Sequence, residues 1–316
     1  MRAGTVDEGR RGNGSAFLRE LAILPMLAVL LGCRSAPPAP PSPPAVSMAE
    51  RAGEQAAKIF AQHNWPAAAR AWQVAVDRSS LLNDLGGEAV ALHNLAQTER
   101  ELAQDAEAQK HLEQAARLNE KLGRASEWWR NQIALLQLEA QFKETTPLKN
   151  HFAKLFPLAP ALHDRSIQAL FLNEVGLWQK SQGEAAKAEK AFAEAEQNFK
   201  AVKDSVGLAT ISANRAELYE EQKNYSAAIA AWKEALARFQ ALADPPHITQ
   251  SLLGEGRTLL TANLDLPAAE NLLRRAARNY QLLQKPQEAQ AALVLLARCL
   301  AAEGKEAESA GQGLPL

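Results

Sequence analysis

The side chains that could do chemistry are few and far apart. No two of the six histidines stand four residues apart, which is the helical spacing of a zinc-binding pair. The sequence has neither a Cys-x-x-Cys motif nor a Gly-x-Ser-x-Gly nucleophile turn, and residues 254–256 lack the third glycine of a nucleotide-binding loop. We therefore expect surface or turn histidines, and a protein that is not an enzyme and uses no metal, cofactor or small-molecule substrate.

The composition of the 316-residue chain favours helices. Apolar residues make up 47% of it but aromatic residues only 6%. From residue 47 onward the strong helix formers alanine, leucine, glutamate, glutamine, lysine and arginine dominate. The 35 basic residues nearly balance the 36 acidic ones, which gives no reason to expect a nucleic-acid partner. Two cysteines, Cys33 and Cys299, cannot make a disulfide framework.

An apolar segment near the N-terminus ends at a cysteine. Residues 21–32 carry no charge, and this run is shorter than the roughly 20 residues that span a bilayer. It suits the apolar region of a signal peptide. The sequence Leu31-Gly32-Cys33 resembles the cleavage site of bacterial lipoproteins. That resemblance implies that residues 1–32 are a signal peptide, and that Cys33 is acylated, with palmitate among its lipids. Alternatively, Cys33 is a small apolar residue in an uncleaved anchor.

A proline-rich stretch follows the cysteine. Six of the chain's 16 prolines fall within residues 37–44, a composition typical of an extended, semi-rigid spacer. We therefore expect residues 33–46 to link a lipid anchor to a folded body. In lipoproteins of this kind, an aspartate after the cysteine retains the protein in the inner membrane. Because Arg34 follows here, the resemblance favours the outer membrane, with the body facing the periplasm.

The rest of the chain repeats with a period of forty residues. One column of equivalent positions holds mostly small residues: Ala68, Ala108, Leu148, Ala188 and Ala228. Four positions later the column is large: Trp72, Leu112, Phe152, Phe192 and Trp232. A sixth unit fits with one inserted residue. Asn64, Asp105 and Thr145 precede second helices as expected N-caps, and Gly183 and Gly304 follow helices as expected C-caps. Such units bury their apolar faces only by stacking.

This pattern of small and large positions resembles the tetratricopeptide repeat, most fully at Ala216, Tyr219, Tyr225, Ala228, Trp232 and Ala235. The resemblance implies an all-α fold, a right-handed α-solenoid of helical hairpins with a period of about 40 residues. We expect six hairpins and a closing helix over residues 47–303. The tail 304–316 lacks apolar periodicity, and we expect it to be disordered.

In that family, certain first-helix positions line the concave groove in which a partner binds. Carried over to this sequence, they are His93, Asn94, Gln97, Arg100, Arg130, Gln137, Asn173, Asn214, Glu217 and Arg257. Such amides and guanidinium groups can bond the backbone and carboxylates of a peptide. The resemblance therefore implies a membrane-anchored scaffold for a peptide or protein partner. Two alternatives stay open: these residues are only solvent-facing, or the groove binds another copy in a self-associating structural lipoprotein.

Two adjacent tryptophans stand out in the third repeat. Consecutive helix positions point about 100° apart, so Trp128 and Trp129 cannot both enter one core easily. Either one ring packs against the second repeat and the other is partly covered, or one is an exposed anchor for a partner.

The lipid anchor can be tested directly. Because Cys33 is the expected acylated residue, Cys33→Ser should abolish palmitate labelling and release the protein from the membrane fraction. Labelling and fractionation of the two proteins, expressed at equal levels, check this. A variant that still labels and pellets with outer membranes would contradict the lipoprotein interpretation.

Overall fold

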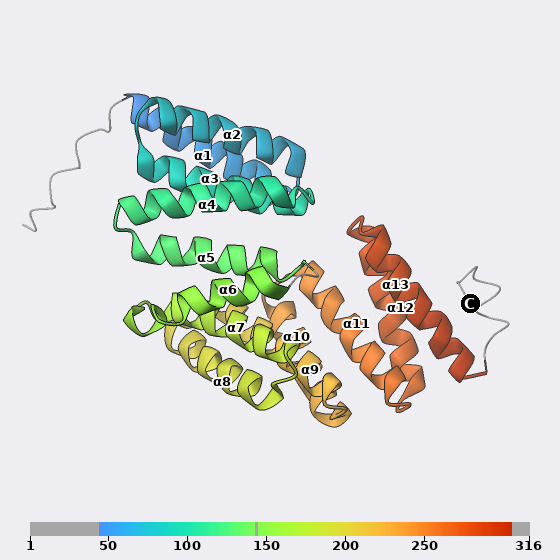
Figure 1. The fold of residues 1–316 in the computed structure, drawn as a ribbon. Helices are drawn as coiled ribbons and strands as arrows, with labels where there is room; N and C mark the ends of the chain where they lie inside the picture. The colour runs from blue at the N-terminus through green and yellow to red at the C-terminus, as the bar shows by residue number, and fades with distance from the viewer. Residues whose placement is uncertain (1–43, 143–144, 305–316) are drawn as a thin grey trace, which may run out of the picture. The chain divides into compact units, whose positions relative to one another are not determined.

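The computed structural model describes residues 44–142 and 145–304, and every regular element in this part of the chain is a helix (Figure 1). The α-helices are α1 (Pro44–Ala61), α2 (Trp65–Leu81), α3 (Leu85–Glu101), α4 (Asp105–Lys121), α5 (Ala125–Glu139), α6 (Thr145–Leu155), α7 (Arg165–Ser181), α8 (Ala185–Val202), α9 (Ser205–Glu221), α10 (Tyr225–Ala241), α11 (Pro245–Thr261), α12 (Leu266–Leu282) and α13 (Pro286–Ala302). A 3₁₀ helix, η1 (Ala159–Ala161), separates α6 from α7.

The helices form consecutive antiparallel pairs. Each odd-numbered helix from α1 to α11 is the first helix of a hairpin, the next is its second helix, and α13 follows the last hairpin. Equivalent helices begin 40 or 41 residues apart, and the extra residue falls in the sixth unit, before Leu266. The predicted all-α fold of stacked helical hairpins is therefore confirmed.

The helical part begins slightly earlier than the sequence predicts. Helix α1 starts at Pro44, inside the predicted spacer, because proline needs no hydrogen-bond partner in the first turn of a helix. The last helix ends at Ala302, and Gly304 follows it. The predicted signal peptide 1–32, Cys33 and residues 305–316 of the predicted tail lie outside the described residues.

Most turns between the described helices are short and contain one residue with a positive φ. Gly183 and Gly304 have a φ of 73°, as expected of C-cap glycines, while Ala103 takes a φ of 55° at an equivalent turn. Asn64 caps α2 as predicted, its side chain accepting a hydrogen bond from Ala67 N at 3.3 Å. The predictions for Asp105 and Thr145 are wrong by one residue, since α4 and α6 already include them.

In the core, aromatic side chains pack against small residues. Alanines of the repeat column, such as Ala188 and Ala228, are completely buried, and Trp232 is 1% exposed. Three glycines on first helices meet aromatic rings of second helices: Gly176 meets Phe192, Gly207 meets Phe199 and Gly254 meets Trp232. A Cβ atom at any of these glycines would overlap the ring. The helices therefore approach this closely only because those side chains are absent.

The third hairpin departs from the regular pattern. Its second helix, α6, has 11 residues, whereas most of the others have 17. Phe152 of α6 stacks on Trp178, and Trp129 packs edge-to-face on Phe171. Trp129 is buried and Trp128 is half-buried against it, as the first of the two alternatives expects. The buried ring packs on Phe171 of the fourth repeat, however, and not on the second repeat. None of the helices described here is long and apolar enough to cross a bilayer.

The close packing of glycine on tryptophan predicts opposite effects at two helical glycines. Gly254→Ala should lower the free energy of unfolding by about 1–3 kcal/mol, because the new methyl group overlaps the Trp232 ring. Gly53→Ala should raise it by about 0.5–1 kcal/mol, because alanine favours the helix and its Cβ would lie 3.8 Å from Trp72. Urea unfolding followed by circular dichroism measures both. Equal shifts in the same direction would show that the packing is not as described.

Candidate functional site

The predicted groove residues all lie on first helices. Helix α3 carries His93, Asn94, Gln97 and Arg100, α5 carries Arg130 and Gln137, α7 carries Asn173, α9 carries Asn214 and Glu217, and α11 carries Arg257. Most of these side chains are half-buried; Asn173 is buried and Arg130 is exposed. We call this set, together with the side chains that bond to it, the first-helix strip.

A chain of hydrogen bonds joins part of the strip across four helices. Arg100 Nη1 donates to Gln137 Oε1 at 3.4 Å, and Gln137 Nε2 donates to Glu174 Oε1 at 2.9 Å. Asn173 Nδ2 donates to the same Glu174 oxygen at 3.1 Å, and Asn214 Nδ2 donates to Asn173 Oδ1 at 2.7 Å. The structure therefore brings these predicted residues together, but they bond one another. We call these five residues the polar ladder.

The carboxyl group at the centre of the ladder is buried. Burial raises the pKa of Glu174 above its ordinary value of 4.5, and the hydrogen bonds from Gln137 and Asn173, together with the positive charge of Arg100, only partly oppose this. Glu174 was not among the predicted binding residues. It stands next to Asn173 and 37 residues after Gln137, close to one repeat, which is the signal that could have identified it.

A second contact joins α3 to α5. His93 Nδ1 lies 2.7 Å from Oδ1 of Asn131, whose side chain is almost fully buried. Sequence reasoning missed Asn131. Equivalent positions hold Ala91, Phe171 and Ile211 in three repeats but Arg51 and Ser251 in two others, so the column gives no clear signal for a polar contact at Asn131.

Ion pairs neutralise the strip on α7, α9 and α11. Lys180 Nζ lies 2.6 Å from Glu217 Oε2, and Arg257 Nη2 lies 2.7 Å from Glu220 Oε2. Glu220 also accepts hydrogen bonds from Trp232 Nε1 at 3.0 Å and from the hydroxyl of Thr258. The predicted residues Glu217 and Arg257 are therefore already paired within the protein.

Other residues of the strip make no bond to a neighbouring helix. Asn94 Nδ2 donates to Val90 O in its own helix at 3.0 Å, and Gln97 accepts a hydrogen bond from Arg100 on the same helix. Arg130 is exposed. These side chains keep donors and acceptors that an extended peptide could use.

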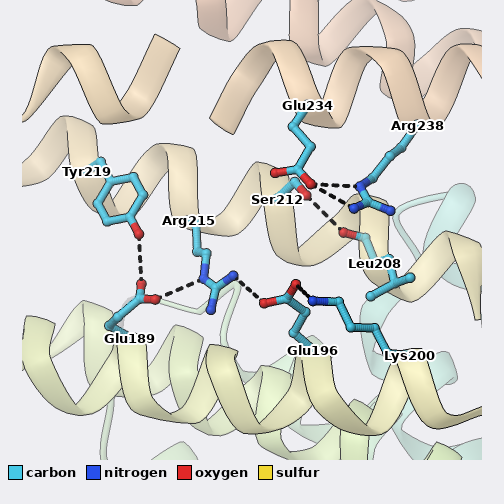
Figure 2. Close-up of polar contacts among 9 residues, drawn as sticks. All are labelled: Glu189, Glu196, Lys200, Leu208, Ser212, Arg215, Tyr219, Glu234 and Arg238. Atoms are coloured by element: carbon cyan, nitrogen blue, oxygen red, sulfur yellow. Dashed lines mark hydrogen bonds and ion pairs between the residues drawn. The ribbon is translucent and has the colours of Figure 1, made fainter. Parts of the chain in front are cut away.

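A different polar cluster joins α8 to α9 (Figure 2). Arg215 forms ion pairs with Glu189 at 3.0 Å and Glu196 at 2.6 Å, Tyr219 donates to Glu189 at 3.3 Å, and Lys200 pairs with Glu196. Positions equivalent to Arg215 hold Leu95, Leu135 and Val175. The cluster therefore replaces an apolar contact between hairpins, and we assign it a structural role.

Two histidines are buried more than the sequence predicted. His111 lies 2.8 Å from Glu99 and His151 lies 3.1 Å from Glu139, each on the second helix of a hairpin facing the first. The expectation of surface histidines is therefore wrong for these two. Each imidazole has a carboxylate partner on the first helix of its own hairpin, and the two carboxylates, Glu99 and Glu139, occupy equivalent positions of successive repeats. Among the described residues, no group of three or more His, Cys, Asp or Glu side chains could hold a metal ion.

A hollow of about 760 Å³ lies between α4, α5 and α6. The half-buried ring of Trp128 lines it, together with apolar side chains such as Leu135 and Leu155. Charges of both signs also line it, including Glu113 and Arg117. Its mixed charge does not favour one class of ligand.

The chain matches no protein-family model and no curated protein. Its fold is shared by solved helical-repeat structures. The apo form of the quorum sensor NprR from B. thuringiensis has a TM-score of 0.64 at 12% identity, over 84% of this chain and 74% of that one. A Rap protein complexed with Competence and Sporulation Factor has a TM-score of 0.56 at 17% identity, over 81% and 74%.

A third similar structure is a STAND signal-transduction ATPase with a tetratricopeptide repeat sensor from Pyrococcus horikoshii. Its TM-score is 0.56 at 20% identity over 82% of this chain, which spans only 40% of that protein. Similarities at this level of identity establish the fold alone. Together with the helical hairpins, they confirm that the chain has a tetratricopeptide-like helical-repeat fold.

The buried carboxyl of the polar ladder predicts a dependence of stability on pH. Because the pKa of Glu174 is raised on folding, the folded protein binds this proton more tightly than the unfolded chain. Stability should therefore fall as the pH rises above 4.5 through the raised pKa. Glu174→Gln removes this titration. The free energy of unfolding of the variant should therefore exceed that of the parent by on the order of 1 kcal/mol at pH 8 and equal it at pH 4.

Glu196→Gln is the matched control for that measurement. Partial burial acts to raise the pKa of Glu196, but the hydrogen bonds and charges of Lys200 and Arg215 outweigh it and lower the pKa. This carboxylate therefore stabilises the fold at neutral pH and loses that effect as the pH falls, so its variant should be the less stable at pH 8. Unfolding measured from pH 4 to pH 8 checks both, and the same sign for the two variants would refute the assignment.

Proposed function

We propose that this protein is a lipid-anchored scaffold of the bacterial envelope, which binds a peptide or protein partner along the first-helix strip. The observation that supports the proposal best is the convergence of predicted groove residues from α3, α5, α7 and α9. Four of the ten, namely Arg100, Gln137, Asn173 and Asn214, belong to one continuous ladder. A strip that crosses several helices suits an extended chain better than a compact small molecule.

The chemistry of the strip supports a peptide ligand. Side-chain amides carry a donor and an acceptor, so Asn94 and Gln97 can bond the N–H and C=O groups of an extended backbone. The ladder holds the helices that carry them in fixed relative positions, which lowers the entropic cost of binding. No cluster of catalytic side chains competes with this interpretation in the described residues, and we propose a non-enzymatic role.

The similar structures are consistent with such a role in other proteins. The Rap structure is a complex with Competence and Sporulation Factor, and NprR is described as a quorum sensor. The STAND protein uses its tetratricopeptide repeats as a sensor. We extend from these proteins only the general property of recognising another molecule through a helical-repeat surface.

The anchoring part of the proposal rests on the N-terminal sequence. Cys33 follows the apolar segment 21–32, and only ten residues separate it from the start of α1 at Pro44. Acylation of Cys33 would attach the helical part to the inner leaflet of the outer membrane, where its partner would lie in the periplasm or in the membrane. Two acyl chains or more are sufficient for stable anchoring.

Capture of the partner tests the proposed surface. The bait is the full-length protein, crosslinked in intact envelopes and purified by affinity. The double variant Asn94→Ala and Arg130→Ala removes two strip residues that make no bond to another helix, so the fold should be unchanged. We expect the captured partner to decrease about tenfold or more, as the loss of two interface contacts predicts.

Two exposed lysines on a second helix provide the matched control. Lys187→Ala with Lys190→Ala changes α8, where the side chains are 64% and 80% exposed, and should leave capture unchanged. Helicity and melting temperature of all baits are compared first. If the α8 variant loses the partner and the strip variant keeps it, another face is the binding surface. If the bait captures only copies of itself, the protein is a self-associating lipoprotein instead.

A further inference from the structure

Exposed apolar side chains concentrate at one edge of the helical repeats. Because the hairpins are antiparallel, first helices begin and second helices end at the same edge, which we call the inter-hairpin edge. Fourteen large apolar side chains are exposed in the described residues, and nine of them lie there: Met48, Leu81, Leu82, Leu122, Phe156, Leu158, Val202, Val206 and Leu282. The opposite edge has two, Phe142 and Leu264. Such a concentration is typical of an interaction surface.

The first two hairpins carry the part of this edge that lies nearest the N-terminus. The start of α1 and the turns that follow α2 and α4 lie on one side, at the left of Figure 1. Arg78, in the last turn of α2, donates to Met48 O of α1 at 3.3 Å. Leu81 follows in the same turn and is 85% exposed, more than any other apolar side chain described. We call four residues the apolar edge: Met48, Leu81, Leu82 and Leu122.

The chain also leaves this edge toward the predicted anchor. Helix α1 starts at Pro44, so ten residues separate it from Cys33. Even fully extended, this segment spans no more than about 40 Å. A lipid on Cys33 would hold the apolar edge within that distance of the bilayer, and a short tether gives even a weak contact a high effective concentration. The bilayer is therefore the surface that the tether keeps nearest to this edge.

We propose that the apolar edge lies on the bilayer that holds the lipid of Cys33. The inference rests on the anchoring part of the proposed function and goes beyond it, because it gives the helical repeats a membrane contact of their own. Exposed leucine and methionine side chains are stabilised when they leave water for the interfacial region of a membrane.

The charges near the apolar edge do not select a type of lipid. The basic residues Arg78 and Lys121 stand in the last turns of α2 and α4. Two acidic residues accompany them: Asp84 caps α3, and Glu120 is exposed beside Lys121. Because both signs are present, we expect an apolar contact that needs no anionic lipid.

The contact would keep the first-helix strip close to the membrane. First helices begin at the inter-hairpin edge, and each helical residue adds 1.5 Å. Asn94 is the tenth residue of α3 and Arg130 the sixth of α5, so they lie about 14 Å and about 8 Å along their helices from the edge. This position favours a partner segment that emerges from the same membrane.

Fluorescent probes on single cysteines test the contact. The acylated full-length protein is reconstituted into phosphatidylcholine vesicles, with the environment-sensitive dye NBD on Met48→Cys or Leu81→Cys. Cys299 is buried, and Cys33 carries the lipid in the proposed protein, so the dye reacts with the new thiol. We expect the emission of both probes to shift to shorter wavelength. Lipids with a nitroxide near the headgroup should quench it.

Two exposed positions away from the apolar edge provide matched controls. Val74 is 44% exposed on the same face of α2 as Leu81, about 10 Å before it along the helix. Leu264 is 53% exposed at the opposite edge. Probes on Val74→Cys and Leu264→Cys should keep the emission that they have in water and escape quenching.

A charge at the most exposed leucine makes the assignment specific. Leu81→Asp should abolish quenching of the Met48 probe, because a carboxylate resists transfer out of water. Leu264→Asp should leave that quenching unchanged. Both sites are exposed, so the two variants should keep the helicity and melting temperature of the parent.

Several results would overturn the membrane contact. Equal quenching at all four probe positions would show that no particular edge faces the lipid. A shift to shorter wavelength without quenching would show that a second copy covers the edge. If the protein does not float with the vesicles, the anchor and the contact are both wrong. If it floats and neither edge probe is quenched, the contact is wrong and the proposed function stands, because the capture experiment tests the strip separately.

Discussion

The close approach of neighbouring helices is the constraint on which the rest of the structure depends. At Gly254 the backbone of a first helix touches the ring of Trp232 directly, and Gly176 and Gly207 meet rings in the same way. Any side chain at these positions would force the helices apart. Because the hairpins are stacked tightly, polar side chains on successive first helices come within hydrogen-bond distance of one another. The polar ladder therefore follows from the packing of the core.

The ladder changes how the strip can bind a partner. From the sequence alone, a row of asparagine, glutamine and arginine side chains suggests groups that are free to bind a partner. In the structure, Gln137 and Asn173 use their amides to hold a buried carboxyl group, and that group keeps its neighbours in place. Groups paired in this way contribute rigidity more than contacts. In the proposed scaffold, the groups left for a partner are those that the ladder does not use, such as Asn94 and Arg130.

The forty-residue period predicted the helical hairpins, the length of each repeat and the extra residue before Leu266. It could do so because each repeat must present the same small and large positions to its neighbours. It also placed the groove residues on the correct helices. It could not predict the bonds between helices. His93 and Asn131 lie 38 residues apart in the sequence. Whether they touch depends on side-chain length and on how the two helices are aligned along their axes. The choice between Trp128 and Trp129 likewise depends on the short helix α6, whose irregular packing no column of the repeat records.

Charge along the strip follows from the same distinction between paired and unpaired groups. In the strip, Lys180 and Arg257 pair with Glu217 and Glu220, each 37 residues away, and repeating hairpins bring residues at this separation together. On α3 and α5 the equivalent positions hold Arg100 and Gln137, and a neutral glutamine cannot balance the arginine. A single uncharged residue in one repeat therefore leaves a positive end on an otherwise neutral strip.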